Sequence, residues 1–143
     1  YGQTGSGKTH TMMGYGGEAG LIPLAVRNLF DVIDQSEGRE FLLRVSYLEI
    51  YQDCIQDLLA DPAAAAAAPK SLKITGRGGD GRVHIGGLRE EVVSSPGAVM
   101  ALLERGAANR HVSATEMNDK SSRSHTIFQL VLESKEFSEP GGD

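Results

Sequence analysis

Eight residues near the start of the sequence have the types and spacing needed to hold a polyphosphate. Gly2 to Thr9 read Gly-Gln-Thr-Gly-Ser-Gly-Lys-Thr and match the pattern G-x-x-x-x-G-K-[ST] completely. The glycines let the backbone wrap tightly, so that successive N–H groups point at phosphate oxygens, and the following helix adds the positive end of its dipole. Lys8 would reach the β- and γ-phosphates, and the Thr9 hydroxyl would bind the bridging magnesium ion. The segment is predicted to be a phosphate-binding loop; the alternative is a glycine-rich turn that matches by chance.

A second polar segment lies near the other end of the sequence. Residues Asn118 to His125 read Asn-Asp-Lys-Ser-Ser-Arg-Ser-His, with three hydroxyls around Arg123. One interpretation is a solvated loop rich in serine. The other is a lid whose hydroxyls and arginine sense whether a γ-phosphate is present. Composition alone does not choose between them.

The segments that would position the phosphate loop show helical and then strand patterns. A helix is predicted to begin at Lys8 and to end at the glycines that follow Met13. A second helix is predicted from about Pro23 to Gln35, because its apolar residues recur at i, i+3, i+4 and i+7. Phe41 to Tyr51 has apolar residues on both parities, which favours a central strand covered on both faces.

The second half of the sequence predicts a hairpin, a helix and a strand. Short strands alternate with glycines from Leu72 to Val93, the pattern of a twisted antiparallel hairpin. A helix is predicted from about Pro96 to Arg105, with Gly106 positioned to end it. Thr126 to Glu133 has strand composition. The order of elements predicts an α/β fold.

Two segments are expected to lie outside this regular structure, residues 61–69 and the C-terminal tail Ser138 to Asp143. Residues 61–69 contain six consecutive alanines between two prolines and are interpreted as a low-complexity loop insertion. Six residues fall short of the roughly 12 to 15 that an isolated helix needs for marginal stability.

A phosphate loop normally follows a strand, and none precedes Tyr1. The chain is therefore expected to be a piece of a longer protein with an incomplete sheet.

Composition and charge exclude several classes of function. The net charge of −5 argues against a nucleic-acid partner, and no apolar run approaches the roughly 20 residues that cross a membrane. Cys54 is the only cysteine, which excludes an internal disulfide and a metal site built on several thiolates.

The segment from Lys70 to Arg89 contains five basic residues and one acidic residue, Asp80, for a net charge of +4. This segment either faces an acidic partner or is a solvated hairpin.

Both polar segments resemble parts of one family. Tyr1 to Met12 closely resembles the kinesin phosphate loop, and Arg110 to His125 is similar to kinesin switch I. The intervening segments of the family are resembled in the right order by Gly20–Pro23, Val45–Tyr51 and Asp57–Leu59. Residues 1–143 thus resemble a partial kinesin motor domain, from the phosphate loop through switch I and the following strand. The resemblance implies the three-layer P-loop NTPase architecture of the kinesin type with an incomplete central sheet.

The resemblance implies a function as well as a fold. Kinesins are ATPases that couple hydrolysis to microtubule binding and movement, so the expected cofactors are ATP and Mg²⁺ and the expected partner is the microtubule (tubulin). Tubulin is acidic, so the sign of the Lys70–Arg89 segment agrees. Arg39–Tyr47 and the short turn after Met13 are most similar to the centromere protein E class. That class implies a location on cytoplasmic microtubules, including the spindle or kinetochore, and a parent that dimerises through a coiled coil.

Individual roles follow from the matched positions. The resemblance implies that Ser121 and Ser122 approach the γ-phosphate and magnesium, that Asn118 shapes the closed loop, and that Arg123 pairs with a glutamate of switch II. No Asp-x-x-Gly-Ser-Glu segment of switch II occurs in the chain, so residues 1–143 alone are expected neither to hydrolyse ATP at motor rates nor to move. The expected catalytic residues are Asn118, Ser121, Ser122 and Arg123; the magnesium ligands are Thr9 and Ser122; the nucleotide contacts are Gly2, Gln3, Thr4, Gly5, Ser6, Gly7, Lys8, Thr9 and His10, the last near the base.

Two other readings are carried alongside the motor. An unrelated P-loop enzyme, such as a small-molecule kinase or a GTPase, would share the loop; a GTPase would need a guanine-reading Asn-Lys-x-Asp segment, and none occurs. A non-motile relative that only docks on microtubules is the second. The intact Lys8, Thr9, Ser122 and Arg123 argue against that relative.

Overall fold

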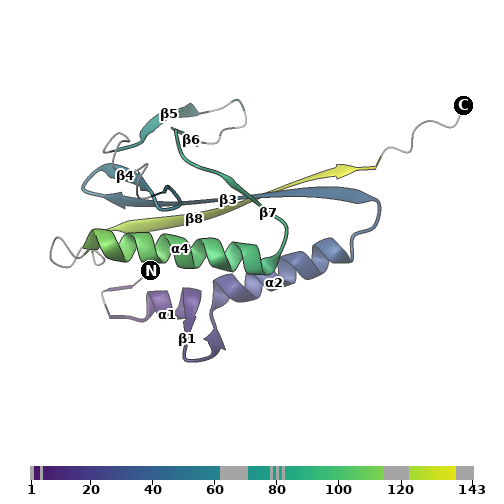
Figure 1. Ribbon diagram of the computed structural model, residues 1–143, viewed down its shortest axis with the longest axis horizontal. Coiled ribbons are helices and arrows are strands. Elements are labelled where there is room, and N and C mark those ends of the chain that lie inside the picture. Colours follow the sequence, from purple (N-terminus) through teal and green to yellow (C-terminus); the bar gives the residue numbers. More distant parts are fainter. Residues whose placement is uncertain are drawn as a thin grey trace, which may run out of the picture.

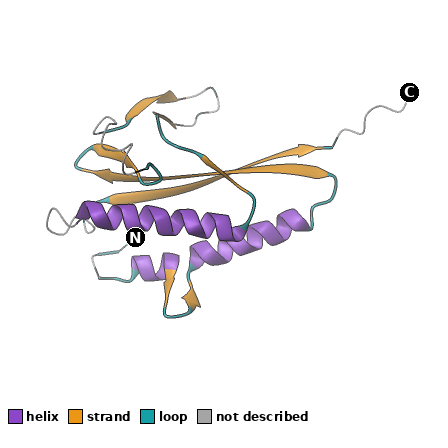
Figure 2. Ribbon diagram, viewed as in Figure 1, coloured by secondary structure: helices purple, strands orange, loops and turns teal. Residues whose placement is uncertain are grey.

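The computed structural model describes residues 2–3, 5–61, 71–77, 79, 81, 83–114 and 123–137. Helices and a sheet alternate along this part of the chain, as expected for an α/β protein (Figures 1 and 2). The elements are α1 (Lys8–Met13), β1 (Gly14–Tyr15), β2 (Glu18–Ala19), α2 (Leu21–Asp34), β3 (Arg39–Tyr51), β4 (Cys54–Asp57), β5 (Lys73–Arg77), β6 (Val83–Gly86), β7 (Glu91–Val93), α4 (Pro96–Ala114) and β8 (His125–Glu136).

Strand β3 is the centre of the main sheet, as its two-sided apolar pattern predicts. Along one edge it pairs antiparallel with β8, from Arg39 opposite Glu136 to Ile50 opposite His125. Along the other edge it pairs with β4 and β7. The predicted final strand is therefore confirmed and longer than expected, because β3 offers backbone partners over its whole length.

The core lies between β3 and the two long helices, which Figure 1 shows along the same face of the sheet. Alternate residues of a strand point to the same face, and the β3 residues Leu43, Val45 and Tyr47 point into this core. The Tyr47 ring meets the Phe128 ring of β8 edge-on at 5.5 Å between centroids. The buried apolar residues of the core are Val26, Phe30, Leu43, Val45, Tyr47, Leu58, Leu59, Val93, Val99 and Leu103.

Helix α2 confirms the prediction from apolar periodicity. It begins two residues before Pro23, which lies in the first turn, where a missing N–H costs nothing. Val26 and Phe30 are buried, and Leu29 and Ile33 pack beside them. The apolar stripe read from the sequence is thus the face that contacts the core.

The predicted end of the next helix is wrong. Gly106 was expected to terminate it, yet α4 continues to Ala114 with Gly106 in its interior. A Cβ built on Gly106 would lie 2.2 Å from Cδ1 of Tyr47. The glycine is there because the helix backbone crosses the aromatic ring closely, which is a tertiary requirement that a local pattern does not contain.

The hairpin predicted between Leu72 and Val93 is present as β5 and β6, which pair antiparallel as a separate two-stranded sheet. The following strand, β7, joins the main sheet instead. The alanine segment from residue 62 and the C-terminal tail from residue 138 lie outside the described residues. In the part of the chain that the structure describes, none of the helices combines the length and the apolar character needed to span a bilayer.

Candidate functional site

The phosphate loop has the backbone conformation that its glycines predict. Gly5 and Gly7 have φ of 80° and 85°, in the left-handed region that only glycine adopts readily. At Gly2 the requirement is spatial, because a Cβ there would lie 2.3 Å from Oγ of Ser6. Helix α1 begins directly after Gly7, and no side chain caps its first turn. All three glycines in the pattern therefore shape the loop, each for a physical reason.

The Lys8 ammonium lies over the loop that precedes it. Its Nζ donates hydrogen bonds to the backbone carbonyl oxygens of Gly2 and Gln3, the latter at 2.9 Å. The loop is closed further by the Ser6 N–H, which donates to the same Gln3 carbonyl at 3.1 Å. Phosphate oxygens can take the place of these carbonyls as acceptors for the Lys8 ammonium, and the left-handed Gly5 and Gly7 give the loop the backbone geometry of an anion-binding nest. The residues present therefore fit a nucleoside triphosphate.

Thr9 and His10 follow Lys8 in the first turn of α1 and are exposed. The His10 ring lies 6.4 Å from the ring of Tyr15, with the two planes tilted by 44°. Tyr15 belongs to the short β1–β2 hairpin, which separates α1 from α2. The hairpin is closed tightly, because a Cβ on Gly14 would lie 2.1 Å from the backbone oxygen of Glu18. Thr4 of the predicted nucleotide set lies outside the described residues.

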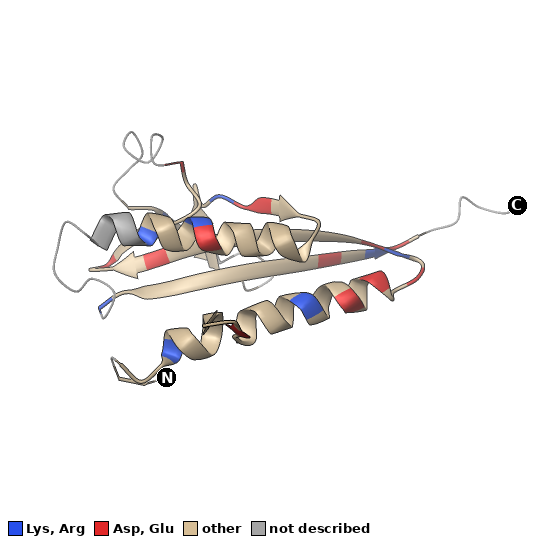
Figure 3. Cartoon of the chain, turned by 60° about the horizontal axis from the view of Figure 1, so that its bottom comes forward, with Lys and Arg blue, Asp and Glu red and all other residues tan. Residues whose placement is uncertain are grey.

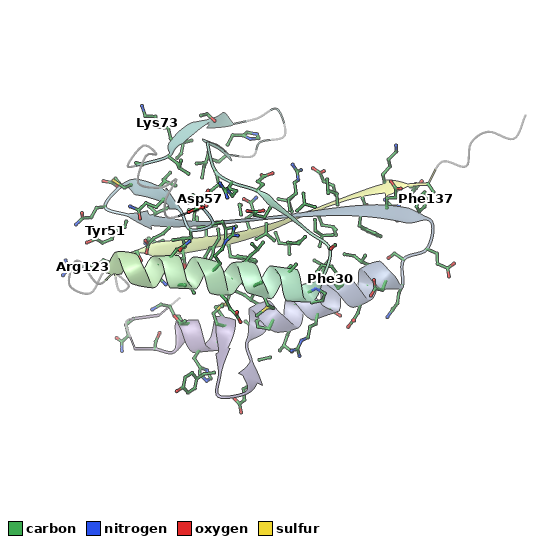
Figure 4. The ribbon with its side chains drawn as sticks, viewed as in Figure 1. Phe30, Tyr51, Asp57, Lys73, Arg123 and Phe137 are labelled. Carbon is green, nitrogen blue, oxygen red and sulfur yellow. The ribbon has the colours of Figure 1, made fainter. Side chains whose placement is uncertain are left out.

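Arg123 is the one member of the predicted catalytic set within the described residues; Asn118, Ser121 and Ser122 lie outside them. Arg123 is exposed and stands two residues before β8 (Figure 4). Figures 1 and 3 both place the start of β8 and the phosphate loop at the same end of the molecule. The fold therefore directs the two predicted site segments toward one end.

A buried ion pair fixes the segment next to Arg123. The Glu49 carboxylate on β3 is 1% exposed, and its Oε1 accepts a hydrogen bond from Nε of Arg110 at 3.1 Å. The same guanidinium donates from Nη2 to Oγ of Ser124 at 2.9 Å. Arg110 belongs to the last part of α4, and Ser124 immediately precedes β8. One arginine thus connects the central strand, the long helix and the segment that carries Arg123.

Two other side chains of α4, Arg105 and Asn109, hold a different segment. Nη2 of Arg105 donates to the Leu59 carbonyl at 3.0 Å, and Nδ2 of Asn109 donates to the Leu58 carbonyl at 2.8 Å. The Asp57 carboxylate accepts from the backbone N–H groups of Leu59 and Arg89, at 2.8 and 2.9 Å. These contacts fix the end of β4 and the entry to β7.

Sequence reasoning missed Glu49 and Arg110 as a pair. One signal was present: Glu49 is the only charged residue between Val45 and Tyr51, a stretch predicted to be buried on both faces. A carboxylate at such a position requires a cationic partner. The sequence does not say which of the arginines supplies it.

The structure describes only some of the basic side chains in the segment from Lys70 to Arg89. Of the basic residues from Lys70 to Arg89, the structure describes the side chains of Lys73 and Arg89, and both are exposed. Lys73 projects outward from β5 (Figure 4), whereas Arg89 lies 3.8 Å from the Glu91 carboxylate. Figure 3 shows Lys and Arg interspersed with Asp and Glu along the described helices and strands. Among the described residues, no group of three or more His, Cys, Asp and Glu could hold a metal ion.

The α/β fold and the loop pattern are those of the P-loop class of proteins, and comparison with known proteins names the family. The Kinesin motor domain family matches residues 1–141. The chain is 51% identical over 136 residues to kinesin-like protein KIN-7O of Arabidopsis thaliana and 48% identical over 136 residues to kinesin-like protein KIN-7I of Oryza sativa subsp. japonica. The chain belongs to the kinesin motor domain family.

A solved structure agrees with this assignment. The chain superposes on a structure described as that of a fast kinesin, with implications for ATPase mechanism and interactions with microtubules, at a TM-score of 0.82 and 39% sequence identity over 95% of its length. It covers 38% of that chain. The matches to the two plant proteins include 95% of this chain, but only 10% of KIN-7O and 11% of KIN-7I. The expected kinesin-type fold is confirmed.

Proposed function

We propose that residues 1–143 are the ATP-binding and switch I part of a microtubule motor, which couples ATP hydrolysis to microtubule binding and movement in the parent protein. The observation that carries this proposal is the phosphate loop. Its left-handed glycines and the Lys8 cation beside it support its role as a polyphosphate cradle, within a chain of the kinesin motor domain family. An unrelated kinase or GTPase is not supported by the family match.

The loop residues have separable roles in this proposal. Gly2 to Gly7 contribute backbone N–H groups to the phosphates, Lys8 contributes its charge, and His10 lies near the base. Thr9 and Ser122 are proposed to hold Mg²⁺, which would neutralise charge on the phosphate oxygens. The Thr9 hydroxyl is exposed beside the loop, and hydroxyl, phosphate and water oxygens are the ligands that magnesium prefers.

The switch residues are proposed to act by position and charge. Arg123 would pair with a glutamate elsewhere in the parent, and Ser121 and Ser122 would approach the γ-phosphate while Asn118 shapes the closed loop. Such a closed site accelerates phosphoryl transfer to water by positioning and charge stabilisation, without a covalent nucleophile. The exposed position of Arg123 leaves its guanidinium accessible to a partner residue.

The microtubule face is proposed to include the segment from Lys70 to Arg89. Its net charge of +4 suits the acidic surface of tubulin, and Lys73 is exposed on β5.

The centromere protein E class stays a proposal for the subfamily, supported by the Arg39–Tyr47 stretch and the short β1–β2 hairpin. The relatives named above are plant KIN-7 proteins. For that class, the proposed setting is cytoplasmic microtubules of the spindle or kinetochore and a dimeric parent.

The proposal is tested with the full-length parent protein. Its ATPase rate should rise when microtubules are added, and its co-sedimentation with microtubules should differ between ATP and a non-hydrolysable analogue. A non-motile relative would co-sediment equally with both nucleotides and would show no stimulated turnover.

Arg123→Ala should leave ATP affinity intact and slow hydrolysis by about 100-fold, because a positioning charge is lost. Normal turnover in this variant would exclude the switch role.

A further inference from the structure

We propose that Arg110 is a positioning residue for switch I: it bridges the buried Glu49 carboxylate to the Ser124 hydroxyl and thereby sets the place of Arg123. The inference rests on the proposed function, because only in a hydrolysing motor does the position of Arg123 change a rate. None of the three side chains is part of the phosphate loop, so this is a role through Arg123 and not through the nucleotide.

Pairing with β3 fixes the backbone of β8 only as far toward Arg123 as His125. The ladder between β3 and β8 ends at Ile50 opposite His125. Ser124 is therefore the first residue beyond backbone pairing, and Arg123 is the second. The Nη2 of Arg110 donates to Oγ of Ser124 at 2.9 Å, and this contact carries the constraint one residue past the end of the ladder.

The other end of the bridge is fixed. Glu49 is fully buried on the central strand, and its neighbour across the ladder is Thr126 of β8. A buried carboxylate strongly favours a charged, hydrogen-bonded partner. The Nε of Arg110 supplies that hydrogen bond at 3.1 Å, while the Arg110 side chain is 25% exposed. The guanidinium is thus anchored on the sheet side and presents its Nη2 edge to Ser124.

The two contacts of Arg110 need the geometry of a guanidinium. A guanidinium is planar and offers donors on two edges in a fixed relation, so it can hold Glu49 through Nε and Ser124 through Nη2 at once. A lysine ammonium at the same position could keep the charge next to Glu49 but has no rigid second edge. The bridge therefore requires arginine, and Arg110→Lys should retain the buried pair while loosening Ser124.

The experiment uses the full-length motor and four variants: Ser124→Ala, Arg110→Lys, Arg110→Gln and, as a matched control, Ser134→Ala. The control removes a hydroxyl on β8 that also accepts from an arginine at the same distance, since Ser134 Oγ accepts from Nη2 of Arg39 at 2.9 Å. It lies at the opposite end of β8 from Arg123. The measurements are kcat, KM for ATP, equilibrium affinity for ATP and thermal stability.

Ser124→Ala and Arg110→Lys should each lower kcat by about 10-fold, less than the roughly 100-fold that a 1 Å misplacement can cost, because Arg123 itself is retained, while ATP affinity stays within about twofold of wild type. Ser124→Ala should also keep wild-type thermal stability, which separates positioning from folding. Ser134→Ala should leave every value unchanged. Arg110→Gln should lower kcat further and lower stability as well, because Glu49 loses its cation.

The inference is overturned if Ser124→Ala and Arg110→Lys hydrolyse ATP at the wild-type rate while Arg123→Ala is slow. It is also overturned if all variants lose ATP affinity and kcat in the same proportion, since that pattern would mean general damage to the fold. Failure of the proposed function looks different: wild-type protein would then show no microtubule-stimulated turnover, and no variant could change it.

Discussion

The phosphate loop and the segment that carries Arg123 belong to the same proposed site, yet they are built in opposite ways. The loop is held by contacts between near neighbours, such as Lys8 to the Gln3 carbonyl and the Thr11 N–H to the Gly7 carbonyl. The segment before β8 is held by Arg110, 14 residues away, which is itself anchored by Glu49, 61 residues farther back. A site can therefore combine a part that is encoded locally with a part that exists only once the sheet and helix have packed.

The largest expected effect breaks the local half of this comparison. Lys8→Ala in the full-length motor should lower ATP affinity by at least about 100-fold, because hydrogen bonds from a charged group contribute roughly 1.5–3 kcal/mol each and Lys8 is expected to contact two phosphates. Equilibrium binding of a fluorescent ATP analogue measures this. Lys135→Ala, which removes an exposed lysine from β8, is the control and should bind normally. Unchanged affinity in Lys8→Ala would remove the basis for the phosphate cradle.

The second effect breaks the long-range half. Glu49→Ala should destabilise the complete motor domain by about 3 kcal/mol, because removing one partner of a buried ion pair leaves the other insufficiently compensated. Urea denaturation of wild type and variant gives the difference in the free energy of unfolding. Glu49→Gln keeps an oxygen that can accept from Arg110 and should cost less. If Glu49→Ala were as stable as wild type, the carboxylate would have no anchoring role.

The third prediction compares two glycines on the same helix. Gly106→Ala should lower the free energy of unfolding by about 1–2 kcal/mol, since its methyl group would overlap the Tyr47 ring and overpacking outweighs the gain in helix propensity. Gly97→Ala should be neutral or stabilising by up to about 1 kcal/mol, because the nearest atom to its Cβ is Oγ of Ser95 at 4.0 Å. Thermal denaturation of the two variants side by side measures the difference. Equal behaviour would show that the Tyr47 contact does not matter.

The last prediction, similar in size to the third, sharpens the local half. Gly7→Ala should weaken ATP binding by about 5- to 30-fold, because a residue with a side chain pays roughly 1–2 kcal/mol for the left-handed conformation at φ 85°. Gly79→Ala is a suitable control, since this glycine has no positive φ and its Cβ would lie in open space. ATP affinity is again the measurement. A Gly7→Ala variant that binds normally would mean that the loop reaches its conformation without glycine.

Elements whose pattern is local were predicted well. The start of α1, the apolar stripe of α2 and the central position of β3 follow from glycine spacing, helical periodicity and an apolar run on both parities. The error at Gly106 has the opposite origin. Glycine after an apolar helical run usually signals the end of a helix, and here the same residue serves close packing against Tyr47.

The sequence by itself determined the phosphate loop and the family of the chain, because a loop conformation that depends on left-handed glycines is written into the residues that adopt it. It did not determine which arginine would meet the carboxylate at Glu49, or that Arg110 would also reach Ser124. Those contacts depend on the register of β8 on β3 and on how far α4 extends over the sheet. Only tertiary packing fixes these two quantities, since they join residues that are remote along the chain.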